Sequence, residues 1–457
     1  MSKSVLTLAI GAALLVTAVA SAQSQTARLW ASRYDGPASQ LDQPQGLAVA
    51  PDGSKLFVTG SIAGNEDYGT IAYDAASGAP LWVKRYSGPG RGDDGATAAG
   101  ISPDGSRLFV TGTSTGSGGN YDYATVAYDA ATGKMLWASR YDGANNFDAA
   151  RSLGVSPDGS KVFVTGMSVG SGTDFDYETV AYDAATGKLL WASRYDGPGN
   201  GADQATALGV DPDGSKVFVT GYSTGAGSGY DYATIAYDAA TGNELWVKRY
   251  DVHGDYSLAL GISPDGSRLF VTGTSSPAGS GYGDYATIAY DAAAGTELWV
   301  RRYGTPQERG SDVADALGVS PDGSRLFVTG HASQGNDDYT TIAYDAATGS
   351  RLWLKRFDGT GHGKDIARAL GVSPDGSTLF VTGESVGSRT DSDYATVAYS
   401  ALSGARLWVK RYNGPPNGSD DAFALGVGPD GSKVFVTGGS TGSGTGWDYA
   451  TVAYGAG

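Results

Sequence analysis

Few residue types in this chain could take part in covalent chemistry. Among its 457 residues there is no Cys and there are only three His, which excludes a thiol nucleophile, a thiolate metal site and a disulfide framework. The sequence contains no nucleophile elbow, phosphate-binding glycine loop or zinc-binding helix motif. We therefore look for function first among charged residues at positions where otherwise similar segments differ.

Those similar segments are marked by the motif Pro-Asp-Gly-Ser, which occurs eight times at spacings of 52 to 57 residues. Residues that recur in every segment are expected to maintain the structure, whereas matched positions that vary are candidates for function. The motifs begin at Pro51, Pro103, Pro157, Pro212, Pro264, Pro321, Pro374 and Pro429.

Two matched positions vary strongly. The position after Val-Thr-Gly holds Ser61, Thr113, Met167, Tyr222, Thr274, His331, Glu384 and Gly439. The position six residues before each Pro holds Gln45, Thr97, Arg151, Thr206, Leu258, Asp315, Arg368 and Phe423. We predict a mixed-charge ligand pocket formed by Arg151, Arg368, Asp315, Glu384 and His331. The alternative is ordinary variation at solvent-facing positions. His253 and His362, in loops that enter the innermost strands, could likewise join such a pocket or a metal site, or be ordinary surface residues.

Asp recurs at two further positions, where sixteen carboxylates could suggest metal binding or acid/base catalysis. Because these residues are present in every segment, we expect them instead to accept hydrogen bonds from loop amides or to pair with a recurrent Arg. No metal site is assigned. The first set is Asp42, Asp94, Asp148, Asp203, Asp255, Asp312, Asp365 and Asp420. The second is Asp67, Asp122, Asp176, Asp231, Asp284, Asp338, Asp393 and Asp448.

Each segment predicts four strands. In one copy they cover residues 208–211, 216–221, 231–237 and 244–250, separated by turns and Gly/Ser-rich loops. A repeated four-stranded antiparallel unit of this length is typical of a β-propeller blade, and eight blades lie within the known range.

The two ends of the repeat region are complementary. Residues 448–454 form a third strand with no fourth strand after it, and residues 28–34 form a fourth strand with no blade before it. We therefore predict an all-β, eight-bladed propeller closed by pairing these strands, with residues 23–457 as one domain. A recurrent Trp in the fourth strand is expected to pack between neighbouring sheets. The eight copies are Trp30, Trp82, Trp137, Trp191, Trp246, Trp299, Trp353 and Trp408.

Residues 181–191 resemble the tryptophan-docking motif of quinoprotein-type propellers, A-x-D-x-x-T-G-x-x-x-W. Three other copies match it fully, while those ending at Trp82, Trp299 and Trp408 depart from it. Residues 156–166 are similar to the blade repeats of secreted bacterial propellers of the YVTN and SBBP types. These resemblances imply the fold. The families concerned include outer-membrane assembly scaffolds, and they also include dehydrogenases that use pyrroloquinoline quinone (PQQ).

The N-terminus predicts secretion. An apolar run at residues 5–19 precedes Ala-Ser-Ala, so we expect a signal peptide at residues 1–22, with an uncleaved anchor as the alternative. The mature chain should be periplasmic or extracellular, should have no membrane span and should be a monomer. A net charge of −16 disfavours nucleic acid as a partner.

These features favour a non-catalytic scaffold that presents one face to a protein, glycan or small-molecule ligand. One alternative is a PQQ-dependent dehydrogenase, which the resemblance implies would also hold calcium. Alcohol-oxidising members of that class carry a vicinal disulfide, which a chain without Cys cannot form. A second alternative is a lactonase-like hydrolase with a metal held by central carboxylates. Both alternatives rest on analogy of fold, and the sequence itself requires no cofactor.

Overall fold

A computed structural model describes residues 28–457 except 38–40, 64–66, 91, 144–145, 171–173, 228, 253, 277–281, 305–309, 334–335 and 389. The predicted signal peptide and His253 lie outside the described residues. The described chain forms eight sheets of four antiparallel strands, which confirms the predicted eight-bladed propeller. We number the blades in chain order: β2–β5, β6–β9, β10–β13, β14–β17, β18–β21, β22–β25, β26–β29, and β30–β32 with β1.

Seven blades run outward from the central channel in chain order, and the eighth runs from β30 to β32 and ends with β1. The innermost strands are β2 (Gln43–Val49), β6 (Asp94–Ile101), β10 (Asp148–Val155), β14 (Asp203–Val210), β18 (Asp255–Ile262), β22 (Val313–Val319), β26 (Asp365–Val372) and β30 (Asp420–Val427). The second strands are β3 (Lys55–Ile62), β7 (Arg107–Thr115), β11 (Lys161–Val169), β15 (Lys216–Gly225), β19 (Arg268–Ser275), β23 (Arg325–Ser333), β27 (Thr378–Val386) and β31 (Lys433–Gly442).

The outer half of each blade completes the sheet. The third strands are β4 (Asp67–Asp74), β8 (Tyr121–Asp129), β12 (Phe175–Asp183), β16 (Gly229–Asp238), β20 (Asp284–Asp291), β24 (Asp337–Asp345), β28 (Ser392–Ser400) and β32 (Gly446–Gly455). The outermost strands are β5 (Pro80–Tyr86), β9 (Met135–Tyr141), β13 (Leu189–Tyr195), β17 (Glu244–Tyr250), β21 (Glu297–Tyr303), β25 (Arg351–Phe357), β29 (Arg406–Tyr412) and β1 (Arg28–Tyr34).

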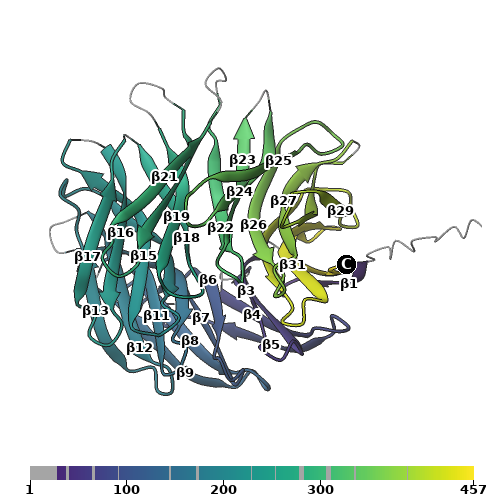
Figure 1. The fold of residues 1–457 in the computed structure, drawn as a ribbon. Helices are drawn as coiled ribbons and strands as arrows, with labels where there is room; N and C mark the ends of the chain where they lie inside the picture. Colours follow the sequence, from purple (N-terminus) through teal and green to yellow (C-terminus); the bar gives the residue numbers. More distant parts are fainter. Residues whose placement is uncertain are drawn as a thin grey trace, which may run out of the picture.

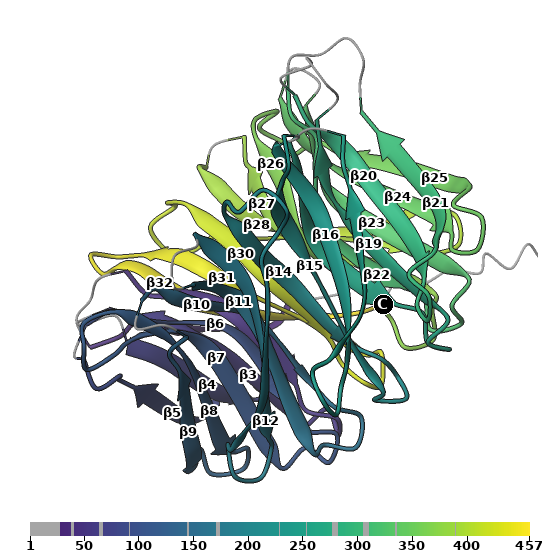
Figure 2. The same ribbon diagram turned by 90° about the vertical axis from the view of Figure 1, so that its left-hand side faces the viewer.

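The ring closes between the two ends of the described chain. Strand β1 pairs antiparallel with β32, and this pairing places Trp30 opposite Ala453. Figure 1 shows β1, in purple, beside the yellow strands of the last blade. The side view in Figure 2 likewise shows the first and last blades next to each other.

Strand direction defines two faces of the ring. The Pro-Asp-Gly-Ser turns lie on the face that we call the bottom, where Gly159 adopts a φ of 70° and Asp158 Oδ1 accepts the Ser160 amide at 2.9 Å. A left-handed residue at this position favours Gly because it has no Cβ. The loops that enter the innermost strands and the loops between second and third strands lie on the opposite face, the top.

The core lies between blades. Trp137 packs between Phe109 of its own blade, at 5.8 Å between ring centroids, and Tyr182 of the next blade, at 6.3 Å. Its Nε1 donates to Ala184 O at 3.1 Å. Matching indole bonds to the next blade are made by Trp30, Trp82, Trp191, Trp299, Trp353 and Trp408. The recurrent Trp therefore docks each blade onto its neighbour, as the sequence predicts.

A search of the described residues for helices long and apolar enough to cross a bilayer found none.

Candidate functional site

A β-bulge interrupts every innermost strand at the same point. In β26, for example, the pairing with β27 shifts between Ala367 and Ala369, which leaves Arg368 outside the ladder. Bulges re-aim side chains and are common next to functional sites. The bulge residues are Gln45, Thr97, Arg151, Thr206, Leu258, Asp315, Arg368 and Phe423. One of the two variable positions of the sequence is thus the bulge of each blade, in the upper part of the channel wall.

Four of the five predicted pocket residues come together on blades 6 and 7. Arg368 Nη1 lies 3.7 Å from Asp315 Oδ1, and its Nη2 lies 3.5 Å from Glu384 Oε1. His331 Nδ1 lies 3.3 Å from Asp315 Oδ2. The side chains of Asp315, His331 and Glu384 are 14–15% exposed, whereas that of Arg368 is 37% exposed. The group is thus a charged cluster in which Arg368 is the most accessible member.

Arg151 does not join this cluster. It is the exposed bulge residue of β10 in blade 3, four blades around the ring from Arg368 in blade 7. Its positive charge acts on Tyr222 of the next blade, where it opposes the rise in the pKa of that phenol caused by burial. Arg151 and Arg368 therefore lie on opposite sides of the channel.

Two further charged residues extend the cluster. Lys364, in the loop that enters β26, lies 3.4 Å from Glu384 Oε1. Asp421 of blade 8 lies close to Glu384 and accepts a hydrogen bond from Ser392 Oγ at 2.6 Å. Burial and the negative charge of Glu384 raise the pKa of Asp421 to about 6, against the opposing effects of Ser392 and Arg368. The full group of Asp315, His331, Lys364, Arg368, Glu384 and Asp421 is called the central cluster below.

Sequence reasoning missed Asp421 because it compared two variable positions and left out a third. The third lies eight residues before each Pro and faces the residue after Val-Thr-Gly across the first two strands. Its members are Gln43, Gly95, Ala149, Gln204, Tyr256, Val313, Ile366 and Asp421. Lys364 also has counterparts in the other copies, because it directly precedes the recurrent Asp365, but this variable position was not compared either.

An aromatic cluster occupies another part of the top face. Tyr222 and Tyr230 of blade 4 contact Tyr256 of blade 5, with ring centroids 5.0 to 5.3 Å apart. On blade 8, the bulge residue Phe423 packs against Trp447 at 6.4 Å. Partly exposed aromatic rings with polar tips are common in binding surfaces.

The recurrent Asp residues make the structural contacts expected from the sequence. Asp203 accepts backbone amides from Gly197 at 2.5 Å and Thr224 at 2.7 Å, which fixes two loops at the top of β14. Asp122 pairs with Arg140 at 2.7 Å. The same third-strand pairing is made by Asp67, Asp176, Asp231, Asp284, Asp393 and Asp448. His362 lies outside the central cluster and contacts Asp358 at 2.6 Å on the surface.

Comparison with known families agrees with this architecture. Residues 15–165, 122–282 and 283–451 match the family model described as outer membrane protein assembly factor BamB. The chain therefore belongs to this family of PQQ-like propeller repeats. Among curated proteins, none matches the chain significantly.

Solved structures show the same fold at low sequence identity. Sqt1 from Chaetomium thermophilum, bound to the N-terminus of the ribosomal protein L10, is 15% identical with a TM-score of 0.61, over 92% of this chain and 98% of that one. A europium-containing methanol dehydrogenase is 13% identical with a TM-score of 0.58, over 94% and 93%. The quinohemoprotein alcohol dehydrogenase from Comamonas testosteroni is 12% identical with a TM-score of 0.58, over 94% and 76%.

The central cluster does not fit the quinone of such dehydrogenases. PQQ carries three carboxylates, and a site for it needs cations and hydrogen-bond donors that are free to pair with them. On blades 6 to 8, Asp315, Glu384 and Asp421 already surround the guanidinium of Arg368. A tricarboxylate placed here would face like charges, so the central cluster is not suited to bind this cofactor.

Proposed function

We propose that this protein is a non-catalytic binding scaffold whose top face holds a segment of a partner protein. The observation that carries the proposal is the contrast between the blades. Their packing residues repeat, while the bulge residues at the upper part of the channel differ from blade to blade. A repeated frame with variable projecting residues is suited to specific recognition rather than to one conserved reaction.

The chemistry of the top face favours a polypeptide over a small molecule. Its polar part, the central cluster, has carboxylates that accept hydrogen bonds and a half-exposed Lys364 and Arg368 that donate them. Its aromatic part, around Tyr222, offers apolar surface with hydroxyl groups. An extended segment with charged and apolar side chains can contact both regions, which lie on different blades.

The proposed setting is the periplasm or the exterior of the cell, as a monomer, after removal of residues 1–22. The apolar run at residues 5–19 supports this setting. A partner protein also agrees with two of the similar proteins, an assembly factor and a propeller bound to the N-terminus of another protein.

Site-specific photo-crosslinking tests the proposal. A photoreactive amino acid at Arg151, the exposed bulge residue at the top of β10, is expected to form a crosslink to a protein in cells that express the full chain. The same amino acid at Asp158 is the matched control, because Asp158 is an exposed residue in the bottom turn that follows the same strand.

Crosslinks to one protein from position 151 and not from position 158 would support the proposal. Equal crosslinking from both positions, or crosslinks from neither, would contradict it. A crosslink only to glycan would show a scaffold for a different class of partner.

A further inference from the structure

Carboxylates from two neighbouring blades meet in threes at four junctions on the top face. Each group takes two Asp residues from one blade and one from the next blade. The first blade provides the Asp of its third strand and the Asp that follows its outermost strand. The next blade provides the Asp at, or just before, the start of its innermost strand. One oxygen from each member lies within 4.8 Å of the others. The groups are Asp35, Asp42 and Asp448; Asp122, Asp142 and Asp148; Asp176, Asp196 and Asp203; and Asp338, Asp358 and Asp365.

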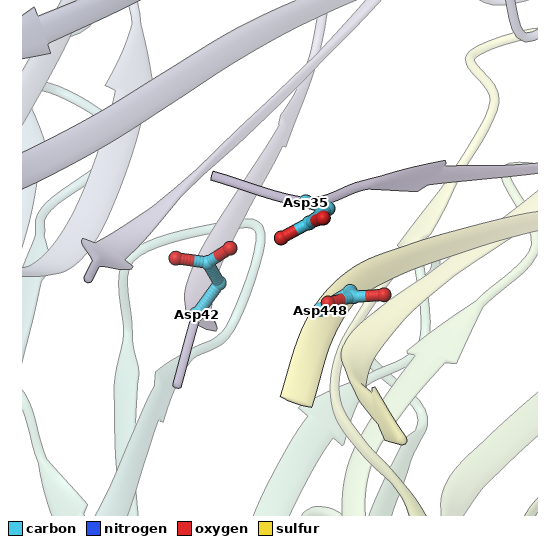
Figure 3. Close-up of side chains that lie close together, drawn as sticks. All are labelled: Asp35, Asp42 and Asp448. Atoms are coloured by element: carbon cyan, nitrogen blue, oxygen red, sulfur yellow. The ribbon is translucent and has the colours of Figure 1, made fainter. Parts of the chain in front are cut away.

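The first group lies where the ring closes. Asp35 follows β1, Asp42 precedes β2, and Asp448 is in β32, so residues from both ends of the chain meet there. Figure 3 shows the three carboxylates gathered around a common space. Any ion bound at this point would join the last blade to the first.

A buried carboxylate oxygen at this junction has no donor. The Asp448 side chain is 7% exposed, and its Oδ2 accepts a hydrogen bond from Arg33 Nη2 at 2.8 Å. Its Oδ1 is buried and has no hydrogen-bond partner within the part of the chain that the structure describes. The equivalent Oδ1 of Asp122, whose side chain is 8% exposed, is also without a donor among the described residues. A buried charged acceptor is costly unless a donor or a cation satisfies it.

The local charge is matched to a divalent ion. Three carboxylates carry −3 when ionised, and the guanidinium of Arg33 beside Asp448 supplies +1, so the junction carries −2.

We propose that these junctions are calcium sites and that the ion at Asp35, Asp42 and Asp448 holds the ring closed. Calcium prefers carboxylate and other oxygen ligands at roughly 2.3–2.6 Å and tolerates irregular geometry. Oxygens up to 4.8 Å apart can surround one such ion. The inference is independent of the partner bound by the top face, because the junctions are formed by repeated residues and not by the bulge residues.

The chain contains its own comparison. After the outermost strand, three blades carry Ser87, Gly304 and Asn413 in place of the Asp. At the first of these, Asp67 has the same buried oxygen with no donor among the residues that the structure describes, and Asp94 holds the matched place on β6. Substitution Ser87→Asp would therefore add a fifth ligand set of this kind to the four present, whereas Asp35→Asn would break the one at the ring closure.

The test is calcium binding by the full-length protein, measured by equilibrium dialysis with the metal alone, and thermal unfolding with calcium or with a chelator. Wild-type protein should bind calcium and its Tm should rise with the calcium concentration, since a ligand that binds only the native state stabilises it. Asp35→Asn should bind one ion fewer and Ser87→Asp one ion more. A circular dichroism spectrum equal to that of the wild type establishes that each variant is folded.

Failure to bind calcium at millimolar concentration would overturn the proposal. The same conclusion follows if folded Asp35→Asn binds as many ions as the wild type, or if folded Ser87→Asp gains none. A magnesium-induced rise in Tm equal to that with calcium would contradict the assignment of the ion.

Discussion

Asp421 links the central cluster to pH. Its carboxyl group lies beside Glu384, Arg368 and Ser392, and its pKa of about 6 is raised mainly by burial. The ordinary value is 3.8. Because the folded pKa is the higher one, the unfolded chain releases this proton first as the pH rises from about 4 to about 6. The free energy of unfolding therefore falls as the pH rises through that range. Above about pH 6 this loss of stability is complete.

The variant Asp421→Asn should accordingly be more stable than the wild type at pH 8. One pKa unit corresponds to about 1.4 kcal/mol, and partial exposure screens part of it, so we expect a gain of about 1–2 kcal/mol. The gain should disappear below pH 4, where the wild-type carboxyl group is neutral. Thermal unfolding of both proteins across this pH range checks the prediction, and a variant that is less stable at pH 8 would refute it.

At the residue scale, internal comparison of the copies identified most of the central cluster. Asp315, His331, Arg368 and Glu384 were found because they differ from their counterparts at matched positions. Their convergence follows from the adjacency of blades 6 and 7. Arg151 was grouped with them although its blade is on the far side of the ring. Whether these residues bind a ligand stays a prediction.

At the element scale, the strands follow from the sequence, but the bulges do not. The period-two sequence pattern and the turn motifs predict four strands in each blade. The extra residue in each innermost strand depends on the register of backbone pairing with the second strand. Register is a property of two paired strands, so the sequence of one strand does not reveal which residue is left out of the ladder.

The docking of one blade onto the next can be tested with a pair of tryptophans. Trp137 donates its Nε1 hydrogen to Ala184 O, whereas the buried Nε1 of Trp246 has no acceptor within the described residues. Replacement by Phe removes the N–H in both cases and reduces the ring by a similar amount.

The variant Trp137→Phe should therefore lose more stability than Trp246→Phe. The expected difference is about 1 kcal/mol, the net value of a hydrogen bond in a protein. Denaturant unfolding of both variants measures it. Equal losses would show that only the packing of the indole ring, and not its hydrogen bond, holds the blades together.

At the scale of the whole molecule, the ends of the chain determine how the ring is held. With no Cys in the sequence, no disulfide can close it. Closure depends on the pairing of β1 with β32 and on Trp30, which packs against Phe435 and Tyr73 at 6.0 and 6.4 Å. The complementary ends predicted this pairing because a blade with three strands and a strand with no blade complete each other.

Removal of residues 1–34 should expose the edge of β32 and the aromatic surface that Trp30 covers. An unpaired edge strand with apolar neighbours favours association between chains. We expect a lower Tm and a shift to dimers or larger species on size-exclusion chromatography. A truncation to residue 27, which leaves β1 in place, is the control. A monomer with unchanged Tm after removal of β1 would contradict the closure described above.

The central claim is that the variable bulge residues carry partner binding while the repeated residues carry the fold. The most direct measurement is the affinity of the crosslinked partner for the double variant Asp315→Thr/Arg368→Thr. Threonine occupies the bulge naturally in blades 2 and 4, where Thr97 and Thr206 donate to the next blade at 3.0 and 2.9 Å, so the fold accepts it. We predict that the double variant keeps the circular dichroism spectrum of the wild type and loses affinity by about tenfold or more, equivalent to at least about 1.4 kcal/mol. An unchanged affinity with an intact fold would contradict the account.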